Sequence, residues 1–151
     1  MMQPMFTKEE SHKMTTPKTS WMKIYNSDIN NELLVVYEDG KKILNTKNTN
    51  YSYGTLVDVL EYGLDTIPME NINSVLLLGM GVGSIIKSLR EKYNCNAEVT
   101  AVEIDPTVIE IAKTEFDFDN FSKVKIENCD AWDFVENSKQ KFDLIINRYI
   151  Y

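Results

Sequence analysis

The stretch that decides the fold is Val75-Leu76-Leu77-Leu78-Gly79-Met80-Gly81-Val82-Gly83. Its first four residues form an unbroken apolar run, which is typical of a strand buried on both faces of a parallel sheet. Three glycines follow at alternate positions, and glycine permits both a positive φ and a close approach of the backbone to a ligand. The amphipathic residues after Gly83 predict a helix, whose first N–H groups favour an electronegative ligand group. We therefore predict that Gly79, Gly81 and Gly83 form a ligand-binding turn.

Acidic residues follow the next two apolar segments. Glu103 lies about 20 residues after the glycine turn, where dinucleotide-binding and S-adenosyl folds place an acid on ribose hydroxyls. Asp130 and Ala131 follow the third predicted strand. A carboxylate there can accept from an adenine amino group while backbone N–H groups meet ring nitrogens. The structural alternatives are a solvent-facing Glu103 and an Asp130 that caps a helix over residues 131–136, and Asp130 can serve both roles.

Strand and helix patterns alternate from residue 75 onward. Four strands are predicted, at 75–78, 99–104, 124–127 and 142–146. Between them, residues 84–93 are amphipathic, and Asp105-Pro106 is a typical helix start with a capping Asp and a first-turn Pro. Strand-helix-strand repetition of this kind predicts an α/β fold, Rossmann-like, with about four parallel strands.

The chain before this sheet divides into two parts. Residues 1–20 are polar and contain two prolines, so we predict a flexible tail. Residues 21–53 predict a small antiparallel β-hairpin module, because Asp39-Gly40 is a strong hairpin turn signal between two β-rich runs. Residues 54–151 are then the Rossmann-like nucleotide-binding domain, incomplete. It opens with a short helix over 55–62 that Gly63 is expected to end.

Composition excludes several classes of protein. The chain has 151 residues, 43% hydrophobic and 26% charged, with a net charge of −7, which is typical of a soluble acidic domain and argues against a nucleic-acid binder. No apolar run approaches the ~20 residues that span a bilayer, and there is no signal peptide, so we expect no membrane partner and a cytoplasmic location. Cys95, Cys129 and His12 match no metal-ligand spacing, so no metal site is predicted.

Together the glycine turn, Glu103 and Asp130 resemble the S-adenosylmethionine-dependent methyltransferases. Within that superfamily the chain is most similar to the spermidine synthase family of polyamine aminopropyltransferases, in which a small N-terminal β-module precedes the Rossmann-like domain. The resemblance covers about residues 21–147. It implies a transferase that binds S-adenosylmethionine or its decarboxylated form, acts on an amine or polyamine-like substrate, and forms a homodimer. It also implies that Tyr51 and Tyr53 line the substrate pocket, with core packing as their structural alternative.

The chain departs from the family at two charged positions. The family's glycine turn carries an Asp that contacts the amine end of the donor, and Val82 stands there instead. The family's catalytic Asp follows the fourth strand, where this sequence has Asn147 and Arg148. Asparagine cannot act as a carboxylate base, and Arg148 would repel a cationic polyamine. The catalytic residue is therefore unknown, and true spermidine synthesis is disfavoured.

Three alternative functions are also compatible with the sequence. Val82 and the missing Asp favour a small-molecule S-adenosylmethionine-dependent methyltransferase. The methyltransferase fold usually has seven strands and only four are found here, so we expect a C-terminally truncated chain or a second chain that covers the open surface. Truncation in turn favours a catalytically inactive nucleotide-binding or interaction fragment. A nicotinamide-dependent oxidoreductase ranks lower, because the Asp130 motif and the N-terminal module fit it poorly.

Overall fold

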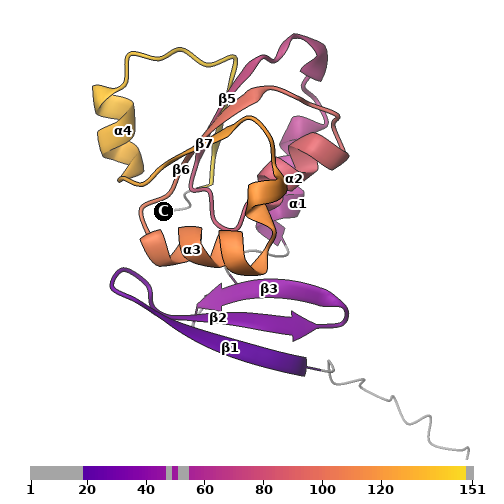
Figure 1. The fold of residues 1–151 in the computed structure, drawn as a ribbon. Helices are drawn as coiled ribbons and strands as arrows, with labels where there is room; N and C mark the ends of the chain where they lie inside the picture. The colour runs from indigo at the N-terminus through magenta and orange to yellow at the C-terminus, as the bar shows by residue number, and fades with distance from the viewer. Residues whose placement is uncertain (1–18, 47–48, 51–54, 149–151) are drawn as a thin grey trace, which may run out of the picture.

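The computed structural model describes residues 19–46, 49–50 and 55–148. These residues form an antiparallel sheet of order β1-β2-β3-β4 and a parallel sheet of order β7-β6-β5-β8. Helices accompany the second sheet, and the first sheet lies beside helix α3 (Figure 1). The predicted α/β fold, with four parallel strands after an antiparallel β-module, is confirmed.

The antiparallel sheet consists of β1 (Thr19–Ser27), β2 (Asn31–Glu38), β3 (Lys41–Thr46) and the short β4 (Thr49–Asn50). Asp39 and Gly40 join β2 to β3 with φ angles of 48° and 79°. Two positive φ values are what a tight hairpin turn requires, so the predicted turn is confirmed. Leu33, Val35 and Leu44 are fully buried and belong to the main apolar core of the molecule.

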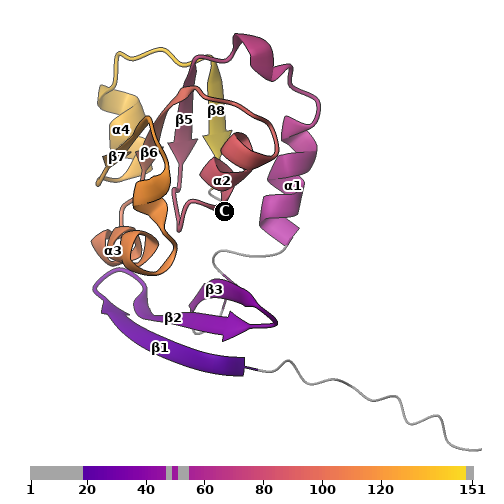
Figure 2. The ribbon, with the colours of Figure 1, turned by 45° about the vertical axis from the view of Figure 1, so that its right-hand side comes forward.

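The parallel sheet consists of β5 (Ser74–Leu78), β6 (Glu98–Val102), β7 (Val124–Glu127) and β8 (Leu144–Asn147). Side chains of β5 alternate between two apolar clusters, which explains its unbroken apolar run. Leu77 packs in the cluster that includes residues of α2 (Ser84–Glu91) and α3 (Pro106–Glu115). Leu76 and Leu78 pack with Ala131 at the start of α4 (Ala131–Asn137). Figure 2 shows α4 on the opposite side of the sheet from α2.

The remaining helices are α1 (Thr55–Leu64) and the 3-10 turns η1 (Met69–Asn71) and η2 (Phe118–Asn120). The prediction that Gly63 ends α1 is wrong, because Gly63 lacks the positive φ of a terminating glycine and the helix runs on to Leu64. Within the described ranges, no helix is both long enough and apolar enough to cross a bilayer.

The amino end of α3 is bound to the β-module through Asp105, which caps the helix as predicted. Its Oδ1 accepts a hydrogen bond from the Thr107 N–H at 2.8 Å. Its Oδ2 accepts from the Ser27 hydroxyl and from Asn30 Nδ2. Burial acts to raise the pKa of Asp105, but these hydrogen bonds outweigh it and hold the pKa below its ordinary value. The capping carboxylate therefore joins the β-module to the start of α3.

The carboxyl end of α3 is bound to the same module through Glu115. Its Oε1 accepts from Lys23 Nζ at 2.6 Å and from the Tyr25 hydroxyl at 2.7 Å, while Lys42 Nζ donates to the Glu115 carbonyl. The hydrogen bond from Lys23 lowers the pKa of Glu115, and burial with the Glu115 contact raises the pKa of Tyr25 to about 12. Helix α3 is thus fixed at both ends.

The glycine turn between β5 and α2 adopts positive φ at three positions, Gly79 (83°), Gly81 (56°) and Gly83 (89°). At Gly83 there is a second constraint, because an added Cβ would lie 2.7 Å from a carbon of the Phe118 ring. Glycine at 83 is therefore required by the packing of η2 beneath the turn, in addition to its backbone conformation.

Replacing Glu115 by glutamine should lower the free energy of unfolding by about 1 kcal/mol at pH 7, because Lys23 loses its charged partner while Tyr25 keeps an acceptor. The pKa of Glu115 is lower in the folded chain than its ordinary value of 4.5. Its contribution to the free energy of unfolding is therefore fully present above the pKa that Glu115 has in the unfolded chain. This contribution is lost as the pH falls through the lower pKa of the folded chain. Urea unfolding across this pH range should show the two proteins converge.

Glu91→Gln is the matched control. Its side chain is 65% exposed, and its carboxylate lies 4.0 Å from Lys87 Nζ. Loss of the charge should therefore change the free energy of unfolding by less than about 0.5 kcal/mol. Equal effects of the two substitutions would show that Glu115 does not hold the module to α3.

Replacing Gly83 by alanine should destabilise the fold by about 2 kcal/mol or more, because the residue combines a left-handed φ with a clash against Phe118. Gly63→Ala is the control, since a Cβ there meets nothing within 4 Å and alanine favours a helix by about 1 kcal/mol. Denaturant unfolding should therefore shift in opposite directions for the two variants. A shift of the same sign would contradict this account of the turn.

Candidate functional site

The candidate site lies at the carboxyl ends of the parallel strands. The chain runs from β5 to β6 to β7 in one direction across the sheet and then returns to β8 on the other side of β5. The order therefore reverses between β5 and β8. In open α/β sheets, ligands bind outside the carboxyl ends of the strands at such a switch point.

Glu103, the first residue after β6, connects two of the predicted binding elements. Its Oε2 accepts a hydrogen bond from the Gly81 N–H at 2.9 Å, and its Oε1 accepts from the Asp105 N–H at 3.1 Å. The glycine turn is also held to β6 directly, since the N–H groups of Gly79 and Met80 both donate to the Val102 carbonyl. Of the three predicted glycines, Gly81 is thus in direct contact with the predicted acid.

Glu103 is shielded from solvent, with only 1% of its surface exposed. Burial raises the pKa of the Glu103 carboxyl above its ordinary value, while the two backbone hydrogen bonds and the charge of Arg148 act in the opposite direction. The alternative of a solvent-facing glutamate at a strand end is therefore wrong. Two of the roughly four lone-pair positions of a carboxylate are occupied by backbone donors, which leaves capacity for further donors.

Asp130 and Ala131 lie at the start of α4, beyond the end of β7. Asp130 Oδ1 accepts from the N–H groups of Trp132 at 2.7 Å and Asp133 at 3.2 Å, so the predicted cap is confirmed. Capping occupies one carboxylate oxygen and leaves the adenine role of Asp130 a prediction. Ala131 is buried and packs against the sheet, which places its backbone at the base of the helix.

Asn128 follows β7 directly, and no role for its side chain was predicted from the sequence. Its Nδ2 donates to the carbonyls of Glu103 at 2.8 Å and Ile104 at 3.0 Å, so it bridges the ends of β6 and β7. It therefore holds the segments of Glu103 and Asp130 in a fixed relation. The sequence signal for this role was the position of the Asn128 amide, directly after β7 and two residues before Asp130.

Arg148 follows β8 and reaches across the switch point. Its N–H donates to the Leu78 carbonyl at 2.9 Å, and its Nη1 donates to the Met80 carbonyl at 3.3 Å. A Cβ added to Gly81 would overlap the Arg148 guanidinium. Gly81 therefore lies between an acid and a base, with Glu103 bound to its N–H and Arg148 packed against its Cα.

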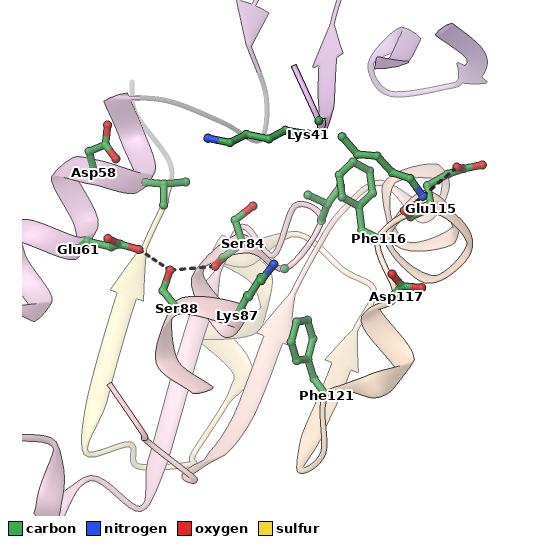
Figure 3. A pocket seen from close by; sticks show the side chains of 15 residues that line it. Lys41, Asp58, Glu61, Ser84, Lys87, Ser88, Glu115, Phe116, Asp117 and Phe121 are labelled. Atoms are coloured by element: carbon green, nitrogen blue, oxygen red, sulfur yellow. Dashed lines mark hydrogen bonds and ion pairs between the residues drawn. The ribbon is translucent and has the colours of Figure 1, made fainter. Parts of the chain in front are cut away.

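A cavity of about 760 Å³ opens on the other side of the glycine turn. It is bounded by the β2–β3 turn, α1, the start of α2 and the end of α3, and Val82 and Ser84 form part of its wall. Figure 3 shows Asp58 and Glu61 on its α1 side and Lys87 near Ser88 on α2. Its lining carries charges of both signs. Tyr51 and Tyr53, the predicted substrate-lining residues, lie outside the described residues.

The chain is similar in sequence to known transferases. A polyamine aminopropyltransferase from Thermoplasma acidophilum is 31% identical over 149 residues, which cover 90% of this chain and 49% of the relative. An eEF1A lysine and N-terminal methyltransferase from Danio rerio is 32% identical over 99 residues, 59% of this chain and 14% of the relative.

Among solved structures, spermidine synthase in complex with the transition state analogue AdoDATO superposes with a TM-score of 0.55 at 19% identity. The match covers 94% of this chain and 59% of that chain. This chain therefore spans about half or less of the length of the two relatives in sequence. The likeness in structure supports the fold described above.

The model of the spermine/spermidine synthase domain family matches residues 58–150. That match covers more than half of the chain and includes the glycine turn, Glu103, Asp130 and Arg148. By this match, the chain belongs to the spermine/spermidine synthase domain family.

Proposed function

We propose that this domain binds an adenosyl-sulfur donor, either S-adenosylmethionine or its decarboxylated form, as part of a transferase acting on an amine or another small acceptor. The observation that carries the proposal is the hydrogen bond between the Gly81 N–H and Glu103 Oε2. It joins a glycine turn, which admits a ligand to the backbone, to a carboxylate that suits the two hydroxyls of a ribose.

The other binding roles follow from the same edge of the sheet. Gly79, Gly81 and Gly83 let the donor approach the backbone, and Glu103 accepts from the ribose. Asp130 and the backbone N–H of Ala131 meet the adenine ring. Asn128 fixes the distance between the ribose and adenine positions, because it ties the end of β7 to the carbonyls after β6.

The proposed reaction is a nucleophilic substitution at a carbon bonded to the sulfonium. The lone pair of the acceptor attacks this carbon, the C–S bond breaks, its electron pair stays on sulfur as a neutral thioether, and the acceptor loses a proton to solvent. The main contribution of the protein is alignment of the two reactants. The cavity beside Val82 and Ser84 is the acceptor position that we favour, with Tyr51 and Tyr53 as further candidates from the sequence.

The choice between methyl and aminopropyl transfer is the finer question. Relatives named for each activity match this chain. A small-molecule methyltransferase is the second candidate. Two observations favour it. Buried Val82 offers no carboxylate to the ammonium of a decarboxylated donor, which lacks a carboxylate of its own. Arg148 stands where a carboxylate base would be needed.

Four further properties of the chain stay predictions from the sequence. They are a cytoplasmic location, a homodimer, a small-molecule rather than nucleic-acid or membrane partner, and the division at residues 20 and 53. Gel filtration with light scattering and limited proteolysis would test the dimer and the division.

Replacing Glu103 by glutamine should weaken binding of S-adenosylmethionine and methylthioadenosine about tenfold or more, because the charged acceptor for the ribose hydroxyls is lost. Calorimetric titration of the 151-residue chain measures this effect directly. Glu98→Gln is the matched control, since Glu98 is exposed at the opposite end of the same strand, and its affinities should equal those of the parent.

NAD completes the ligand series, because it shares the adenosine but not the sulfur-linked group. Binding of the adenosyl-sulfur ligands with weak or no binding of NAD supports the proposal. Equal affinity of the Glu103→Gln variant and the parent, both shown to be folded by circular dichroism, would remove Glu103 from the site. Failure of a folded parent chain to bind any of these ligands would overturn donor binding by this domain.

A further inference from the structure

Arg148 is held in a defined position at the switch point of the sheet. Its backbone N–H is bonded to the Leu78 carbonyl and its guanidinium to the Met80 carbonyl, so both ends of the residue are attached to the β5 turn. The guanidinium lies so close to Gly81 that a Cβ there would overlap it. A positive charge therefore stands at the place where ligands of open α/β sheets bind.

The charges on the two sides of Gly81 differ. Glu103 is on the N–H side and is 1% exposed, whereas Arg148 is only partly buried. The side chains of the turn itself are apolar, since Met80 and Val82 are buried hydrophobic residues. Among the described residues of the turn, none offers a carboxylate to a ligand ammonium. A ligand at Gly81 therefore lies near both a carboxylate and a guanidinium.

The two candidate donors differ in the group that would meet this guanidinium. S-adenosylmethionine carries a carboxylate beside its ammonium. The decarboxylated donor has only the ammonium, which adds to the charge of the sulfonium. A guanidinium binds a carboxylate through two parallel hydrogen bonds and repels an ammonium.

We propose that Arg148 selects the donor, binding the carboxylate of S-adenosylmethionine and disfavouring the decarboxylated form. This inference rests on the proposed function, because it assumes that an adenosyl-sulfur donor lies along the glycine turn. A donor that keeps its carboxylate cannot supply an aminopropyl group. The selection by Arg148 therefore points away from aminopropyl transfer in this member of the family.

The test is calorimetric titration of the full 151-residue chain and of Arg148→Gln and Arg148→Asp. The ligands are S-adenosylmethionine, its decarboxylated form, and methylthioadenosine, which lacks the amino-acid part. The parent should bind S-adenosylmethionine about tenfold or more tightly than the decarboxylated donor, a ratio typical of one charge-assisted hydrogen-bonded pair. Arg148→Gln should abolish this preference, and Arg148→Asp should reverse it.

Two controls separate selection from general damage. Loss of the Arg148 charge also acts on Glu103, and methylthioadenosine affinity measures this shared effect. The test therefore compares the ratio of the two donor affinities in each variant, and circular dichroism shows that both variants are folded. Lys139→Asp makes the same change of charge at an exposed loop residue, and it should leave all three affinities unchanged.

Two results overturn the inference. One is a parent chain that binds the decarboxylated donor as tightly as S-adenosylmethionine or more tightly. The other is an affinity ratio that Arg148→Asp does not shift. If methylthioadenosine binds in either case, the proposed function survives and only the role of Arg148 fails. If the folded parent binds none of the three ligands, the proposed function fails together with it.

Discussion

The buried carboxylate of Glu103 is the group on which the arrangement of the site depends. Removing a carboxylate from water carries a large free-energy cost unless hydrogen bonds compensate it. Here the compensation comes from two backbone N–H groups, one in the glycine turn after β5 and one at the cap of α3. The same interaction that makes the burial tolerable therefore fixes the turn, the end of β6 and the start of α3 relative to one another.

Gly81 lies at the centre of an arrangement of opposite charges. Glu103 binds its N–H from one side, and Arg148 packs against it from the other and helps to stabilise the ionised form of Glu103. A ligand that carries both a diol and a carboxylate would match these two groups, because the diol donates to a carboxylate and the carboxylate accepts from a guanidinium. Under our proposal, the charge after β8 decides which donor this chain accepts.

Much of the fold was predictable because its signals are local. The apolar run of β5, the spacing of the glycines and the Asp105-Pro106 helix start each act within a few residues, and the structure confirms them. The reach of Arg148 to Met80 was not predictable, because it joins side chain and backbone 68 residues apart. The hydrogen bonds of Asn128 to the Glu103 and Ile104 carbonyls were unpredictable for the same reason, since they also join residues far apart in the sequence.

One glycine signal failed, at the end of α1. Gly63 was expected to end α1 and instead lies within it, because a glycine ends a helix only where the chain needs a left-handed residue there. The ligand role of Gly83 stays a prediction, and the structure adds a packing role, because a Cβ at this position would meet the Phe118 ring. The candidate site is also connected to the β-module, since Glu103 accepts from the Asp105 N–H, and the Asp105 carboxylate accepts from Ser27 and Asn30. A ligand that hydrogen-bonds to Glu103 should therefore also affect the β1–β2 loop. Slower amide hydrogen exchange in this loop would then report that the distant site is occupied.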